Sequence, residues 1–268
     1  MFERMLHEFA DLRQCASSQD GTKLLGVCQR FGAFNLVVNA DRISPARAAD
    51  EGFDLANDVA NAGRFGILAY DDFNVFHVAI GAGLNPFVEL DAHALEAFSA
   101  TAKRWFSAAR MVTVDHHTLN RALIGREIDF YVSGGVYTCS PIRLEGHSNI
   151  RAITPKRGPI GGKGGIVFAE VTSIIERADT PAAAENFLDY MLRPEVSIKL
   201  AFGAGTCNPI MQMGDPAVMR AFSRDKLDAI QWDTLVEEVA LCAPYAIAPN
   251  YSALHARLVA ARFGAGWT

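Results

Sequence analysis

The sequence predicts an α/β fold, because β-rich apolar runs alternate with amphipathic helical segments along the whole chain. Short runs such as 33–39 (AFNLVVN) and 65–70 (FGILAY) are typical of strands, whereas 90–109 repeats apolar residues at helical spacing. With 268 residues, 50% of them apolar, the chain is long enough for one large domain or for two lobes.

In the first half of the chain, residues Phe2, Met5, Leu6 and Phe9 fall at helical spacing and predict an opening helix. Asp91 is the expected N-cap of the long helix at 90–109. The other helices are expected at 55–61, 75–82 and 118–124, and the strands at 33–39, 65–70, 111–114 and 128–132.

The second half begins with a strand at 150–154, a glycine-rich loop at 158–165 and a strand at 166–174. Thr180 and Pro181 form a strong helix start, with Thr as N-cap and Pro at the first helical position. Helices are therefore expected at 180–192, 195–202, 216–224, 226–241 and 250–262.

Composition excludes several classes of protein and of site. The net charge is −5 and no block of Lys or Arg occurs, so no nucleic-acid partner is expected. The chain contains no apolar run long enough for a membrane span or a signal peptide, which predicts a cytoplasmic protein if Met1 is the native start. Five widely spaced cysteines favour reduced, mostly buried thiols, and no cofactor is expected.

Two motifs suggest ligand or metal chemistry, and their details argue against it. Lys163 in the glycine loop is followed by Gly164 instead of the Ser or Thr of a P-loop, so a hinge or surface loop is favoured. His116 and His117 lack carboxylate partners at metal-ligand spacing, so we expect solvated or capping histidines and no metal site.

Carboxylates and an aromatic residue at two strands are the better candidates for a binding site. Asp71 and Asp72 follow the strand at 65–70, and Glu170 lies inside the otherwise apolar strand 166–174. Phe168 is two residues from Glu170 and therefore shares its face of the strand. An aromatic ring beside a carboxylate suits a cationic amine, through cation–π contact and charge-assisted hydrogen bonds.

Two stretches of the second half are distinctive, GIVFAEVTS (165–173) and AAAENFLDYMLRPEVSIKLAFGAGTCN (182–208), and LLGVCQRFGAFNLVVN, GRFGILAYDD and GREIDFYVSGG precede them. With these stretches in this order, the chain resembles the bacterial spermidine/putrescine-binding proteins of ABC transporters. The resemblance implies a type II periplasmic-binding-protein fold, in which two α/β lobes close on a ligand. It places lobe one at 1–63 and 156–268 and lobe two at 64–155. Lobe one is then incomplete, because the family carries a further segment with its first two strands before 24–39.

The same resemblance implies a ligand site. Asp72 matches a family carboxylate that binds a polyamine amine, while Phe168 and Glu170 stand where the family usually has tryptophan and aspartate. The tryptophan expected near Ser133 is absent, which disfavours long polyamines. The auxiliary candidates are Tyr70, Asp71, Ser133 and Tyr137.

The resulting hypothesis is a binding protein for a small cationic amine, with Asp72 and Glu170 as charge partners and Phe168 as stacking wall. The family implies an ABC permease as partner and a periplasmic location. The incomplete lobe predicts a homo-oligomer or a second chain that completes it. The alternatives are a cytoplasmic enzyme on the same fold, with Glu170 or a histidine as general base for a small amine or amidine, and a regulatory half-receptor.

Overall fold

The computed structural model describes residues 6–175, 181–203 and 205–267. Over these residues the protein is a mixed α/β fold with a seven-stranded mixed sheet, which confirms the predicted fold class. The expected helix positions Phe2 and Met5 and the expected N-cap Thr180 lie outside the described residues.

The sheet is organised around one long strand. Neighbouring strands follow the order β3-β2-β4-β1-β6-β7, and β5 also pairs with β1. The strands are β1 (Val27–Asn39), β2 (Phe65–Leu68), β3 (Met111–Thr113), β4 (Phe130–Gly134), β5 (Ile150–Ile153), β6 (Gly165–Thr172) and β7 (Cys242–Pro244).

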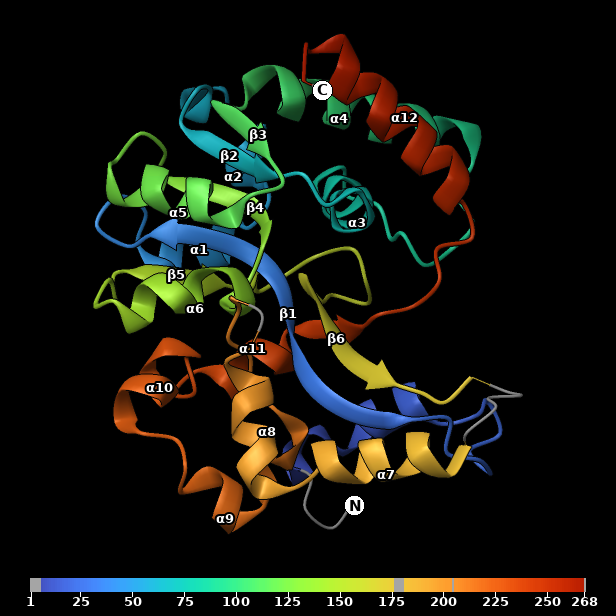
Figure 1. The fold of residues 1–268 in the computed structure, drawn as a ribbon. Helices are drawn as coiled ribbons and strands as arrows, with labels where there is room; N and C mark the ends of the chain where they lie inside the picture. Colours follow the sequence, from blue (N-terminus) through green and yellow to red (C-terminus); the bar gives the residue numbers. More distant parts are fainter. Residues whose placement is uncertain (1–5, 176–180, 204, 268) are drawn as a thin grey trace.

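Strand β1 runs through both halves of the molecule (Figure 1). Its final residues pair antiparallel with β4 and with β5, whereas its first part pairs antiparallel with β6. The register shifts between Asn35 and Leu36, where β1 passes from one set of neighbours to the other. Arg30 is the one charged residue of β1, and the rest of the strand can therefore be buried on both faces.

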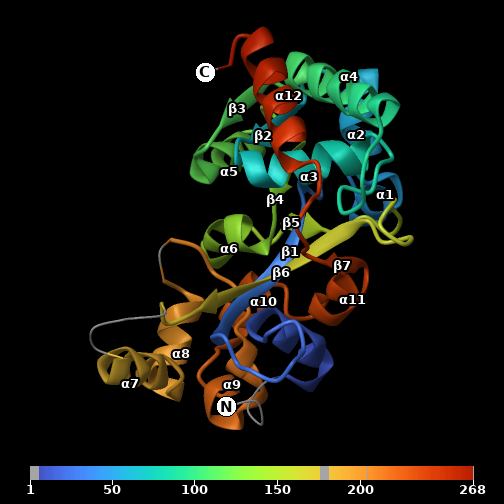
Figure 2. The same ribbon diagram turned by 90° about the vertical axis from the view of Figure 1, so that its right-hand side faces the viewer.

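Helices surround the two ends of this strand. Figure 2 shows α3, α4 and α12 grouped at one end and α7, α8 and α9 at the other. The helices are η2 (His7–Ala16), α1 (Pro45–Glu51), α2 (Asp54–Asn57), η3 (Val59–Asn61), α3 (Asp71–Gly81), α4 (Ala92–Ala108), α5 (His116–Ile124), α6 (Val136–Leu144), α7 (Pro181–Met191), α8 (Pro194–Ala201), η4 (Met211–Gly214), α9 (Pro216–Met219), α10 (Arg224–Ala229), α11 (Leu235–Ala240) and α12 (Tyr251–Gly264).

The side chains of β1 contribute to separate hydrophobic cores. Phe34, Leu36 and Val38 belong to the core covered by α3, α4 and α12, whereas Phe31 and Ala33 belong to the core formed with η2, η4 and α8. This alternation follows from the two-residue period of a strand. Strand β6 shows the same division, with Phe168 packing against the first core and Ala169 and Val171 against the second.

Several elements differ from the sequence-based expectation. The Asp91 cap of α4 is confirmed, because its carboxylate accepts a hydrogen bond from the Ala94 amide at 2.8 Å. Helix α3 begins at Asp71, four residues before the expected start at 75, because the carboxylates suit the first turn of a helix. The helix expected at 226–241 is two helices, α10 and α11, separated by Gln231 at φ +52°.

The division into lobes at 1–63 with 156–268 and at 64–155 stays a prediction. Strand β1 connects all seven strands into one network, so no break in the sheet marks a boundary. Helix α12 packs against α3 and α4, so the C-terminal helix shares a core with elements of 64–155 (Figure 1).

Candidate functional site

Three of the predicted site residues, Asp72, Phe168 and Glu170, line one cavity beside β6. Its volume is about 500 Å³. We call this cavity the edge pocket. Its lining residues are Cys15, Phe34, Asp72, Phe73, Phe168, Ala169, Glu170, Val171 and Tyr245.

Aromatic rings form one wall of the edge pocket. The Phe168 ring stacks on Phe34 with ring centroids 4.5 Å apart, and Phe34 contacts Phe73 at 4.0 Å. Phe168 lies over Gly32, where a Cβ atom would come within 3.2 Å of the ring. Sequence reasoning missed Phe34, Phe73 and Tyr245, although Phe73 directly follows the predicted Asp72.

Asp72 supplies an exposed carboxylate at the start of α3. The Tyr251 hydroxyl of α12 donates a hydrogen bond to one of its oxygens. Burial, followed by this contact with Asp72, raises the pKa of Tyr251 to about 12, and burial and the charge of Asp72 raise the pKa of Tyr245. Because none of the described lining residues is basic, Asp72 gives the pocket a negative charge.

Glu170 has a cationic partner within the chain itself. Arg30 Nε lies 2.7 Å from Glu170 Oε2, and Arg30 Nη1 donates to Thr206 Oγ1 at 3.1 Å. Sequence reasoning missed Arg30, although a signal existed: Arg30 and Glu170 are the only charged residues of the paired strands β1 and β6. A cation in the pocket would therefore share Glu170 with Arg30.

Asp71 and Tyr70 are not among the lining residues, although they adjoin Asp72. The carboxylate of Asp71 is held by α12, through Arg262 and through His255 Nε2 at 3.3 Å. Tyr70 is half-buried and packs edge-on against Phe73 at 5.7 Å. The structure thus uses Asp71 to fix α3 against α12, which positions Asp72.

Ser133 and Tyr137 lie buried behind the aromatic wall. Ser133, at φ +68°, accepts a hydrogen bond from Asn74 Nδ2 at 2.6 Å, and its Oγ lies 2.9 Å from His77 Nδ1. The Tyr137 hydroxyl donates to the Ser133 carbonyl at 3.1 Å, and its ring meets Phe168 edge-on at 5.8 Å. These two residues therefore support Phe73 and Phe168 from behind instead of reaching the cavity.

The glycine-rich loop at 158–165 and the pair His116–His117 both have structural roles. Gly158 and Gly164 lie where a Cβ atom would collide with backbone oxygens, so the loop is tightly folded. The cavity beside it, of about 340 Å³, is lined by one cation, Arg157, and by the two carboxylate residues Glu51 and Asp54, so its charge does not favour a phosphate. His116 and His117 lie in the first turn of α5, which Asp115 caps. Among the described residues, no three His, Cys, Asp or Glu side chains come together in a way that could hold a metal ion.

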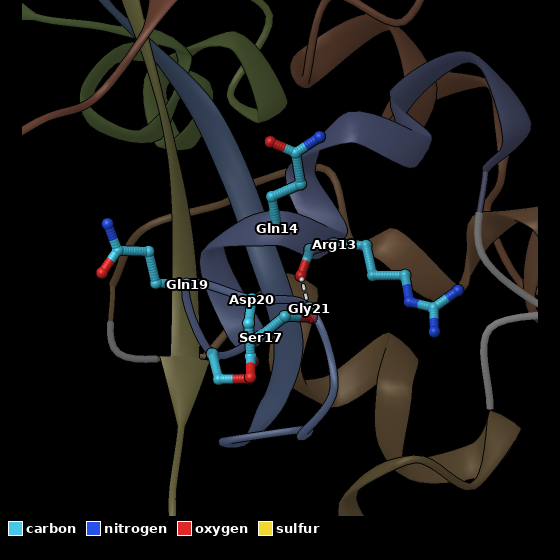
Figure 3. Close-up of a pocket in the computed structure, with 7 residues that line it drawn as sticks. Arg13, Gln14, Ser17, Gln19, Asp20 and Gly21 are labelled. Carbon is cyan, nitrogen blue, oxygen red and sulfur yellow. Dashed lines mark hydrogen bonds between the residues drawn. The ribbon is translucent and has the colours of Figure 1, made fainter.

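Another cavity, of about 670 Å³, surrounds the loop after η2. Its lining residues run from Arg13 to Gly21, and Figure 3 shows Arg13, Gln14 and Gln19 extending in three different directions. Asp20 accepts hydrogen bonds from Ser18 and Thr22, which lower its pKa to about 2. These bonds stabilise the loop itself, and the side chains do not converge on a ligand position.

Comparison with known proteins identifies the fold. No family model and no curated protein matches the chain. Among solved structures, the spermidine/putrescine ABC transporter substrate-binding protein PotD of Streptococcus pneumoniae is 15% identical, with a TM-score of 0.64 over 97% of this chain and 75% of that chain.

Two further structures give the same result. The TpPotD lipoprotein of Treponema pallidum is 13% identical, with a TM-score of 0.68 over 98% of this chain and 75% of that chain. The PBP MotA of A. tumefaciens, solved with glucopine, is 14% identical, with a TM-score of 0.61 over 96% of this chain and 78% of that chain. The structural neighbours are therefore ABC transporter substrate-binding proteins, and the fold is consistent with their two-lobe architecture. No described helix combines the length and the apolar character that crossing a bilayer requires.

Proposed function

We propose that this protein is a solute-binding protein that recognises a small cationic amine in the edge pocket. The observation that carries the proposal is the composition of this cavity, which combines the Asp72 carboxylate with stacked aromatic rings and has no basic residue in the part of its lining that the structure describes. Such a site stabilises an ammonium group by charge-assisted hydrogen bonds and by contact with ring faces.

The proposed contacts divide between charge and shape. Asp72 and the half-buried Glu170 are the anionic partners, and Phe168 provides the stacking wall. Tyr251 uses one oxygen of Asp72, and the other can accept from an ammonium group. Cys15 also lines the pocket and is the exposed one of the five cysteines, so its alkylation rate reports on occupancy.

Structural neighbours support this function and extend it. Two are named for spermidine and putrescine transport or as PotD proteins, and one was solved with glucopine. By this likeness, the proposed location is the periplasm and the proposed membrane partner is an ABC permease.

Replacement of Asp72 by Asn tests the proposal. Loss of the carboxylate should weaken putrescine or agmatine binding by about tenfold to a hundredfold, since a hydrogen bond to a charged group contributes about 1.5–3 kcal/mol. Calorimetry and protection of Cys15 from iodoacetamide measure the effect, and mass spectrometry of the recovered amine detects any turnover. Asp50→Asn, an exposed carboxylate paired with Lys156 outside the pocket, is the control. Equal affinity of the Asp72→Asn protein and the wild type for both amines would contradict the proposal.

Replacement of Arg30 by Gln should have the opposite effect. The substitution removes the cation that now pairs with Glu170 at 2.7 Å and leaves that carboxylate available to the ligand. We expect amine affinity to rise by about threefold to tenfold, because the pair is partly exposed and its screened interaction is modest. The double variant Arg30→Gln/Glu170→Gln should lose this gain, and retention of the gain would show that Glu170 does not contact the amine.

A further inference from the structure

The outer edge of β6 is only partly occupied by β7. Strand β7 pairs in parallel with Gly165, Ile166 and Val167, and the Tyr245 amide then donates to the Val167 carbonyl at 3.0 Å. Backbone groups of successive residues point to alternate edges of a strand, so those of Ala169 and Val171 face the same edge as Val167. Beyond Tyr245, no strand of the described residues pairs with this edge.

The edge pocket lies along this open segment. Four consecutive residues of β6, from Phe168 to Val171, line it. Because successive side chains of a strand point to opposite faces, four in a row can line one cavity only where that cavity faces the strand edge. The cavity thus extends the line of β7, with Phe34 and Phe168 on one face of the sheet and Ala169 and Val171 on the other.

We propose that the edge pocket binds an extended basic peptide, which adds to β6 as a further strand. The N–H and C=O groups of Ala169 and Val171 pair with the peptide backbone, and Asp72 receives a lysine or arginine side chain. This inference rests on the proposed function for the anionic character of the site and specifies the class of ligand. Addition of a strand to a sheet edge combines affinity from main-chain hydrogen bonds with specificity from pockets for alternate side chains.

The charges favour a basic peptide over a second copy of this chain. Two β6 edges paired about a two-fold axis would bring their two Glu170 side chains together, along with the Asp72 carboxylates beside them. Like charges opposite one another destabilise a strand pair, whereas a basic side chain complements Asp72. The net charge of −5 for the whole chain acts in the same direction.

Peptides with blocked backbone positions test this proposal while leaving the protein unchanged. The probe is acetyl-Thr-Val-Lys-Val-Thr-Trp-amide, and two isomers carry N-methyl groups either on both valines or on the lysine and the second threonine. In a strand only one of these sets faces β6, so one isomer should bind at least about tenfold more weakly than the other. Equal binding of the two isomers would overturn the proposal, as would failure of the parent peptide to bind. Putrescine is titrated in parallel, so amine binding without peptide binding refutes only this inference, and absence of both refutes the proposed function as well.

A substitution in β6 gives an independent measurement. Val171→Pro removes the outward N–H and keeps the bonds that β6 makes to β1, whereas Val171→Thr keeps the N–H. After thermal melts confirm that both variants fold, the Thr variant should bind the parent peptide at least about fivefold more tightly than the Pro variant. Equal affinities would overturn the proposal, and so would a dimer in light scattering that the peptide cannot dissociate.

Discussion

Below about pH 6.5 the unfolding free energy of this protein should fall by about 1.4 kcal/mol per pH unit because of His77 alone. His77 is fully buried between Phe53, which stacks on it at 4.7 Å, and Ser133. Burial lowers its pKa from 6.5 to about 3, so the native protein keeps the imidazole neutral. Between these two values the unfolded chain binds a proton that the native protein does not.

The direction and range of this effect follow from the two pKa values. Above pH 6.5 the contribution of His77 to stability is complete, and between pH 6.5 and about 3 it is lost progressively. Over the whole range the loss approaches about 4–5 kcal/mol, a large fraction of the stability of an ordinary domain. Urea denaturation at a series of pH values measures it.

The variant His77→Gln separates this titration from that of the carboxylates. Glutamine keeps a polar side chain and cannot take up a proton, so the slope below pH 6.5 should be shallower in the variant by about 1.4 kcal/mol per pH unit. Parallel curves for the two proteins would show that the native state accommodates a protonated His77. Because Ser133 joins His77 to Tyr137 behind the aromatic wall, such a result would also place a positive charge directly behind the candidate site.

Local patterns in the sequence predicted most of the elements and three of the nine described residues that line the edge pocket. The Asp91 cap and the helical period identified α4, and the two-residue period of β6 placed Phe168 and Glu170 on one face. Asp72 was accessible to prediction because it follows a short buried strand, where side chains commonly reach a ligand.

Pairings between distant residues could not be predicted in this way. The Arg30–Glu170 contact joins residues 140 positions apart, and only the antiparallel pairing of β1 with β6 brings them together. Ser133 and Tyr137 were expected at the ligand, but Ser133 is held by Asn74 and His77 of α3. Tyr137 lies on helix α6, whose β-rich residues and Pro141 disguise the helical period. The break between α10 and α11 depends on Gln231, whose side chain bonds both backbone groups of Ala152 on β5.

Arg143 on α6 is the other residue whose replacement should affect stability most. It is 9% exposed, and its guanidinium donates to four backbone carbonyls, two in the segment that follows α6 and two in α10. These carbonyls belong to Ser148 and Ile150 at 2.6 and 2.8 Å, and to Asp228 and Ala229 of α10 at 2.7 and 3.2 Å. The planar fork of an arginine can reach all four, whereas a single ammonium group cannot.

We expect Arg143→Ala to lower the unfolding free energy by about 3–5 kcal/mol, because it leaves these carbonyls without a donor and opens a gap beside α6. Arg143→Lys should lose about half as much, since it keeps the charge and part of the packing. The control is Arg224→Ala on α10, whose side chain is 93% exposed and which should unfold like the wild type. Chemical denaturation of the three variants measures the differences. If Arg143→Ala also unfolds like the wild type, water must satisfy the carbonyls; if the loss occurs, this one side chain holds α10 against α6 and β5.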